Sequence, residues 1–221
     1  MKEQVVMSNG NTHCILSLTV VACLLTGCSP AQIYPTIEQH SISLQPGNLE
    51  SYGISFITPS ATTGQEEEKQ AVALVFADAM RKQRSGIRVV PLAETLSAVN
   101  KAGLADRYSH MYSDYRDTGL LNGEILRQIG EVTKVRYVAQ IKVQEFEQIG
   151  RDRLAILGLR IIETKAASVR LFFQIWDTKD GTVAWEATQE LHVAYDTITE
   201  KPLTFQEVVG RAARELVSKL P

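Results

Sequence analysis

Cysteine is scarce in this chain and confined to its beginning. All three cysteines lie within the first 28 of the 221 residues, at Cys14, Cys23 and Cys28. The chain beyond Cys28 therefore forms no internal disulfide and holds no cysteine-ligated metal cluster. The composition of the full sequence, 44% hydrophobic and 22% charged, is ordinary for a protein with an apolar core.

Motifs of catalysis are missing as well. No glycine-rich loop has the spacing that cradles phosphate, and no G-x-S-x-G motif occurs. Beyond Cys28 the histidines are too scattered for a metal set, at His40, His110 and His192. The carboxylates Glu145, Glu147 and Asp152 are more typical of a solvated strand end than of an acid–base pair. We therefore expect no enzyme, no cofactor and no metal site.

An excess of charge of one sign is also absent. With 23 Lys and Arg against 25 Asp and Glu, the formal net charge is −2. This balance gives no electrostatic footprint for nucleic acid, so we expect no nucleic-acid partner. The chain has no internal repeat and no low-complexity tract.

The long hydrophobic run of a membrane-spanning helix is missing too. The apolar run begins at Ile15 and, with the small residues after it, ends at Gly27. As a helix this stretch covers about 20 Å, whereas a bilayer core needs about 20 apolar residues. Its length is typical of the central region of a signal peptide.

The residues that close this run resemble the lipobox of bacterial lipoprotein precursors. Leu25, Thr26 and Gly27 provide the leucine and the small residues for signal-peptidase recognition, and Cys28 follows as the residue that receives the lipid. Two alternatives are a cut before Cys23 and an ordinary secretory signal. We expect residues 1–27 to be removed and multiple acyl chains on Cys28, palmitate among them, to anchor the chain firmly. By resemblance to enterobacterial lipoproteins, Ser29 implies the outer membrane, with the domain facing the periplasm.

Composition divides the rest of the chain into a tether and one domain. Residues 28–50 are polar and contain Pro30, Pro35 and Pro46, which predicts a flexible tether with an end-to-end distance of about 25 Å. The alternative is an edge strand, centred on Ile42 to Leu44. Residues 51–221 are expected to form a single α+β domain.

The first half of this domain mixes short strands with amphipathic helices. Alternation predicts strands at 52–57 and 87–90, with a helix from a capping box at Thr63 to about Arg84 between them. A strand, a helix and a strand in this order imply a parallel pair. Further helices are expected at 92–103, at 106–118 and after Asn122, which can cap the last of them.

The expected helix at 106–118 carries an unusual stripe of aromatic residues. Tyr108, Met111, Tyr112 and Tyr115 recur at the spacing of one helix face. Such a stripe either packs on the core with its hydroxyls reaching water, or forms a partner interface, where tyrosine and methionine are enriched. We take these four residues as the candidate partner interface.

The second half of the domain changes to the alternation of β-strands. Strands are expected at 135–143, at 169–176 and from Val183 to about Tyr195, with a turn at 177–181. In that turn Asp177 can accept backbone N–H bonds and Gly181 can take a positive φ. Trp176 and Trp185 are expected to be cross-strand neighbours. Residues 151–167 are compatible with strand extensions, a loop or a mobile hairpin. A last helix is expected to begin at a capping box formed by Thr204 and Glu207.

The segment Phe173 to Glu186, with its Asp–turn–Gly–Trp pattern, resembles the TolB amino-terminal-like group of envelope proteins, which includes CsgG and the lipoprotein activator of a penicillin-binding protein. The resemblance covers residues 51–220. It implies a mixed sheet with helices packed on it, in the order β-α-β-α-α-β-β-β-α, and a non-enzymatic domain that binds other envelope proteins. The alternative is a subunit of a CsgG-like homo-oligomeric export complex. A channel needs membrane-crossing strands of about 9 to 11 residues, and residues 151–167 carry six charges.

Overall fold

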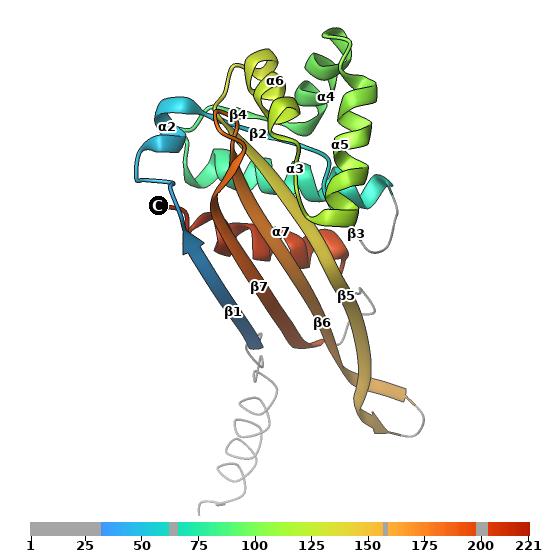
Figure 1. Ribbon diagram of the computed structural model, residues 1–221. Helices are drawn as coiled ribbons and strands as arrows, with labels where there is room; N and C mark the ends of the chain where they lie inside the picture. The colour runs from blue at the N-terminus through green and yellow to red at the C-terminus, as the bar shows by residue number, and fades with distance from the viewer. Residues whose placement is uncertain (1–31, 62–65, 157–158, 198–202) are drawn as a thin grey trace, which may run out of the picture.

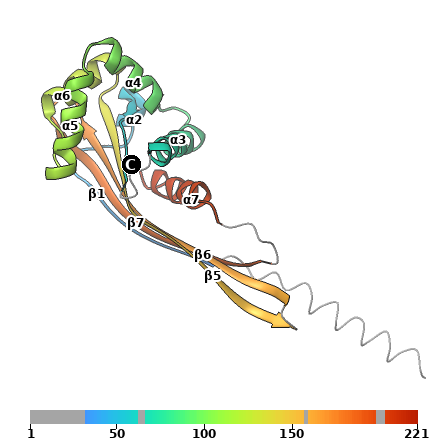
Figure 2. The same ribbon diagram turned by 90° about the vertical axis from the view of Figure 1, so that its right-hand side faces the viewer.

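A computed structural model describes residues 32–61, 66–156, 159–197 and 203–221 of the chain. They form one mixed sheet of seven strands with helices on both faces (Figures 1 and 2), which confirms the α+β class. The strand order is β1-β7-β6-β5-β2-β4, and β3 pairs separately with β5. The strands are β1 (Gln32–Ser41), β2 (Ile54–Phe56), β3 (Ser60–Ala61), β4 (Val89–Val90), β5 (Tyr137–Ile156), β6 (Leu159–Asp177) and β7 (Thr182–Thr197).

Six helices connect and cover these strands in the described residues. They are α2 (Asn48–Tyr52), α3 (Glu66–Gln83), α4 (Leu92–Lys101), α5 (Ala105–Thr118), α6 (Gly123–Thr133) and α7 (Phe205–Val217). The three helices between β4 and β5 confirm those expected at 92–103, at 106–118 and after Asn122, whereas the element order implied by the resemblance has only two there and also lacks β1, α2 and β3. Asn122 caps α6, accepting from the backbone N–H of Glu124 and Ile125, and Thr204 with Glu207 forms the capping box of α7. The expected capping box at Thr63 lies outside the described residues.

The expected flexible tether is wrong for most of its length. Residues 32–41 form β1, which pairs antiparallel with β7 from Gln32, opposite Ala194, to Ser41, opposite Trp185. Ile33 and Ile37 are half-buried against the main core, and Leu44 is fully buried in it. Since β7 offers a long unpaired edge, this polar segment gains ladder hydrogen bonds that composition does not reveal. The alternative of an edge strand is right in kind, but the strand lies before Ile42. The domain therefore includes residues from Gln32 onward rather than from residue 51.

The main core lies between the sheet and the pair of helices α3 and α7 (Figure 2). Phe76 of α3 meets Phe173 of β6 edge-on at a ring-centroid distance of 5.3 Å, and Phe173 in turn meets Trp185 of β7 at 5.5 Å. Helix α7 contributes small and branched side chains to this core, namely Val208, Val209, Ala212, Ala213 and Leu216. Helices α3 and α7 thus cover the part of this face that carries Phe173 and Trp185.

A second, smaller core lies on the opposite face, under α5 and α6. Val138 of β5 and Trp176 of β6 point into it, together with Ile125, Leu126 and Ile129 of α6. The prediction that Trp176 and Trp185 are neighbours is therefore wrong. A register shift pairs Trp176 with Val183 and Ile175 with Trp185, which places the two indoles in different cores.

Below these helices the sheet continues as a long hairpin (Figure 1). β5 and β6 pair antiparallel from Tyr137, opposite Asp177, to Ile156, opposite Leu159. Of the three possibilities for residues 151–167, the strand extensions are correct. β2 pairs in parallel with both β4 and β5, as the strand–helix–strand order predicts.

Candidate interaction surface

The tyrosine stripe of α5 is part of the second core and is not an exposed interface. Tyr108, Met111 and Tyr115 are buried, with 9%, 1% and 5% of their surface exposed, and Tyr112 is half-buried. The periodicity that marked the stripe is that of packing. As an interface prediction the set is wrong, because the residues are already used within the domain.

The tyrosine hydroxyls bind the chain itself. The Tyr108 hydroxyl accepts the backbone N–H of Thr58 at 2.8 Å, and the Tyr112 hydroxyl donates to the carbonyl of Pro59 at 2.9 Å. The Tyr115 hydroxyl donates to Oε1 of Gln174 at 3.3 Å. Burial raises the pKa of Tyr115 to about 12 and also raises the pKa of Tyr108. Helix α5 is thus held to the loop after β2 and to β6 by the hydroxyls of three tyrosines.

The turn after β6 is held by an ion pair. Asp177 accepts the backbone N–H of Lys179 at 3.0 Å, as expected, and also binds Arg136 through two guanidinium nitrogens at 2.6 to 3.1 Å. The hydrogen bonds to Asp177 raise the pKa of Arg136, whose guanidinium also lies over the rings of Tyr52 and Tyr137. Gly181 has φ +74°, and a Cβ there would meet Cα of Gly123 at 2.8 Å. The motif that carries the family resemblance therefore has a structural role.

A face of the sheet below α5 and α6 is the exposed surface on which charged side chains gather. Four strands contribute one residue each to every row across it, because the register aligns them. One row consists of Thr36, Glu190, Arg170 and Glu145, and the next of Glu38, Thr188, Phe172 and Lys142. The helices α3 and α7 cover only the other face (Figure 2). We call the uncovered surface, formed by these two rows and the flanking ones, the open face.

Arg170 lies at the centre of the open face and joins three strands. Its guanidinium lies 3.3 Å from Oε2 of Glu145 on β5 and 3.4 Å from Oε1 of Glu190 on β7. His192 contacts the same oxygen of Glu190 at 3.1 Å. The hydrogen bond from His192, followed by the charge of Arg170, lowers the pKa of Glu190. All four side chains keep between 42% and 55% of their surface exposed.

The open face is acidic in balance. Its rows carry five glutamates against one arginine and one lysine, with His40 and His192 in addition: Glu38, Glu145, Glu147, Glu186, Glu190, Arg170 and Lys142. The sequence predicts that Glu145 and Glu147 are solvated, and this is confirmed for both. The surface as a whole was not predicted. The sequence does show that alternate residues of each strand are polar. Only the pairing of the strands, however, reveals that these polar residues align in rows on one face.

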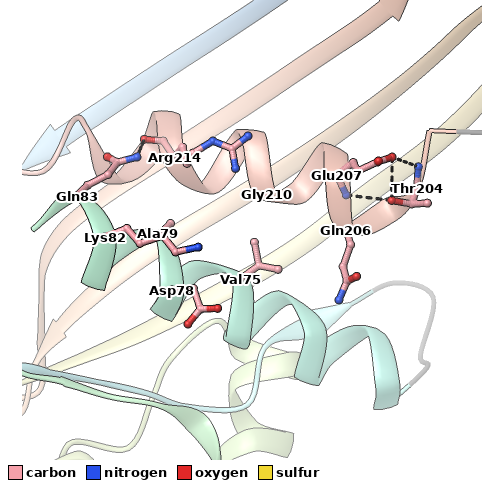
Figure 3. A pocket seen from close by; sticks show the side chains of 10 residues that line it. All are labelled: Val75, Asp78, Ala79, Lys82, Gln83, Thr204, Gln206, Glu207, Gly210 and Arg214. Atoms are coloured by element: carbon pink, nitrogen blue, oxygen red, sulfur yellow. Dashed lines mark hydrogen bonds between the residues drawn. The ribbon is translucent and has the colours of Figure 1, made fainter.

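Hollows also lie elsewhere on the described part of the chain, and two of them are lined by charged residues. A hollow of about 460 Å³ lies between α3 and α7, lined by Val75, Lys82 and Gly210 among others (Figure 3). Another of about 470 Å³ lies at the far end of the sheet beside Arg127, Lys134 and Lys179. The charged residues that line them are ion-paired or exposed on the surface.

The described residues contain no group of three or more His, Cys, Asp or Glu that could hold a metal ion. Within the same residues, no helix has the length and apolar character needed to cross a membrane. The expected lipidation site Cys28 and its recognition residues Leu25, Thr26 and Gly27 lie outside the described residues. Cys28 precedes the first residue of β1 by four positions.

No protein-family model and no curated protein matches the chain. Among solved structures, PelC from Paraburkholderia phytofirmans, crystallised as a dodecamer, is 14% identical over 85% of this chain and 94% of its own, with a TM-score of 0.44. Lipoprotein GNA1162 from Neisseria meningitidis is 13% identical over 76% of this chain and 96% of its own, with a TM-score of 0.43. Because both TM-scores lie below 0.5, the function has to be inferred from this chain's own residues.

Proposed function

We propose that the chain is a lipid-anchored lipoprotein of the cell envelope whose periplasmic domain binds other envelope proteins through the open face, without catalysing a reaction. The observation that carries this proposal is the open face itself. Four rigid strands present charged side chains there that the fold leaves uncovered and that its cores do not need. The TolB amino-terminal-like resemblance of the segment Phe173 to Glu186 agrees with a binding role.

The lipobox-like residues support the lipid anchor, and the position of β1 bears on how far from the membrane such an anchor would hold the domain. The lipobox-like residues end four positions before β1, so a lipid on Cys28 would hold the domain close to the membrane rather than on a long tether. Ser29 favours the outer membrane as its location. Incorporation of labelled palmitate by the native chain, and its loss in Cys28→Ser, tests this part of the proposal.

The acidic balance of the open face defines the chemistry of the partner. A surface with five glutamates favours a partner patch that carries lysine and arginine, because complementary potentials speed association and exclude partners of like charge. Rim charges of this kind contribute more to association rate and specificity than to affinity.

Site-specific photo-crosslinking in intact cells tests the binding role. A crosslinking residue in place of Thr188, at the centre of the open face, should capture a discrete envelope protein, and the additional change Arg170→Glu should change that capture at least severalfold. The matched control is Leu74 of α3, which is 53% exposed and lies away from the sheet. Equal capture from both positions would contradict a role for the open face.

A homo-oligomeric export complex is the second candidate, favoured by the free edges of the sheet. β1 is the terminal strand on one side, and beyond Val143 the described part of β5 pairs only with β6. A second copy could pair with such edges, although Pro35 removes one donor from β1. Analytical ultracentrifugation distinguishes the candidates: a stable ring of eight or more subunits favours export, and a monomer eliminates it.

A further inference from the structure

The hollow at the far end of the sheet is lined mainly by positively charged side chains. It has a volume of about 470 Å³ and lies where β5 begins and β6 ends, beside the last turn of α6. Its lining includes four cations and one anion: Arg127, Lys134, Arg136, Lys179 and Glu131. The chain as a whole carries a net charge of −2, so this excess of positive charge is local. We call this site the basic hollow.

Arg136 is held in a fixed orientation at the basic hollow. Its Nε and Nη2 bind Asp177, whose side chain is only 4% exposed. Its guanidinium also lies 5.1 Å from the ring centroid of Tyr52, a half-exposed residue that lines the same hollow. The N–H groups of Nη1 take no part in these bonds to Asp177. A guanidinium held in this way can donate to a further carboxylate at little cost in side-chain entropy.

Lys134 occupies a backbone position that glycine would fill with less strain. It ends α6 with φ 58° and ψ 38°, and among the described residues it is the only one other than glycine with a positive φ. Helices that end in this conformation usually carry glycine or asparagine there, because a Cβ is strained. Arg88 already binds the carbonyls of Thr133 and Lys134, so the end of the helix does not need the lysine's ammonium. A strained residue without a structural need for its side chain points to a function.

The basic hollow lies at the end of the sheet that is remote from the proposed lipid anchor. Gln32, the first residue of β1, pairs with Ala194 of β7, whereas β7 begins at Thr182 beside the turn that lines the hollow. At about 3.4 Å per residue, the two ends of this stretch of β7 are about 40 Å apart (Figure 1). A lipid on Cys28 holds the opposite end of the sheet at the membrane, so a protein is favoured over a lipid phosphate as the ligand. Arginine and tyrosine are also enriched at protein interfaces.

We propose that the basic hollow binds an acidic segment of a second envelope protein, whose carboxylates lie between Lys134, Arg136 and Lys179. The charge of the hollow is complementary to such a segment and opposite to that of the open face, so the two surfaces select different partners. One domain would thereby bridge two proteins. That the ligand belongs to an envelope protein rests on the proposed function, whereas the binding of carboxylates does not.

Fluorescence anisotropy with a labelled hexaglutamate peptide tests the site on the native chain, purified in a neutral detergent. We expect saturable binding, and Lys134→Glu combined with Lys179→Glu should weaken it at least tenfold. The matched control is Lys101→Glu combined with Lys219→Glu, which reverses two exposed charges elsewhere and should bind within twofold of the parent chain. Equal binding by the two double variants, or no saturable binding by the parent chain, overturns the proposal.

The variant Lys134→Gly separates binding from folding. It removes the ammonium and also relieves the strained backbone, because glycine adopts a positive φ readily. The urea midpoint should therefore rise while the affinity for the peptide falls severalfold. A lower urea midpoint would show that the lysine serves the fold, and a higher midpoint with unchanged affinity would show that its charge binds nothing. Either result contradicts the proposal.

Competition experiments identify the class of ligand. Hexaglutamate should displace the labelled peptide more effectively than polygalacturonate or inorganic phosphate at equal charge. Stronger displacement by either of these would replace the protein partner with an acidic glycan or a phosphate group and overturn the proposal. So would sedimentation of the parent chain as an oligomer that the Lys134→Glu and Lys179→Glu changes dissociate, because the occupant would then be a second copy. Crosslinking from position 188 reports separately on the open face.

Discussion

The two faces of the strands β1, β7, β6 and β5 differ more than any other two regions of the molecule. On β6, Leu171, Phe173 and Ile175 are fully buried under α3 and α7, while Arg170 and Phe172, one position away, lie on the opposite face and keep contact with solvent. Side chains of a strand alternate between faces, so a single segment serves both purposes. The covered face determines the fold, and the open face is available for binding.

The largest expected effect comes from comparing alanine substitutions at two adjacent positions of β6. Phe173→Ala removes a fully buried ring that contacts Phe76 and Trp185 and should lower the free energy of unfolding by about 3–5 kcal/mol. Phe172→Ala, on the open face, should cost about 1 kcal/mol or less. Urea unfolding followed by tryptophan fluorescence measures both. Similar losses at the two positions would mean that something covers the open face within the folded protein.

The upper end of the sheet, where helices lie on both faces, gives the next largest effect. Arg136→Ala leaves the carboxylate of Asp177, whose side chain is 4% exposed, without its charged partner. We expect a loss of about 2 kcal/mol, below the cost of breaking a fully buried pair because Arg136 is itself 34% exposed. The matched control is Arg107→Ala, which breaks an exposed pair with Glu124 and should have little effect. The urea midpoints of the two variants measure this difference, and equal midpoints would contradict it.

A third, smaller effect tests whether the stripe of α5 belongs to the core. Tyr115 has a folded pKa of about 12, raised by burial from the ordinary value of 10. A raised pKa of an acid stabilises the fold fully below the unfolded value, and this stabilisation is lost as pH rises from about 10 towards about 12. Tyr115→Phe should cost about 1 kcal/mol at pH 7 through its bond to Gln174, and its stability should fall less steeply between pH 9 and 11. An unchanged slope in urea unfolding over that range would place Tyr115 in solvent.

Much of the fold could be predicted from the sequence, because local chemistry specifies it. The cap at Asn122, the capping box at Thr204 and the alternation of β6 all depend on residues within a few positions of one another. The turn at Asp177 and Gly181 is equally local. In each case the side chains that identify the element are those that form it.

What could not be predicted depends on partners distant in the chain. Strand β1 looks like a tether because its polar residues and Pro35 pair only with β7, more than a hundred positions later. The tyrosines of α5 look like an interface because the loop at Thr58 and Pro59 that binds their hydroxyls lies some fifty positions earlier. The ion pairs of Arg170 likewise join three strands that periodicity treats separately. In all three cases the missing information is which segments distant in the chain lie side by side.

The smallest expected effect on stability is the most informative for function. Arg170→Gln removes the charge from the centre of the open face, where every partner is exposed, so the urea midpoint should stay within experimental error of the parent. The pKa of Glu190 should rise, because one of the two groups that lower it is lost, and titration followed by NMR measures that rise. A carboxylate whose folded pKa is lowered stabilises the fold at pH values above its unfolded pKa, and this stabilisation is lost as pH falls through the folded pKa. The faint loss of stability that Arg170→Gln causes through Glu190 is therefore expected only at pH values above that range. If Arg170→Gln nevertheless changes crosslinking from position 188, the open face is kept polar for a partner, because the fold itself does not require it.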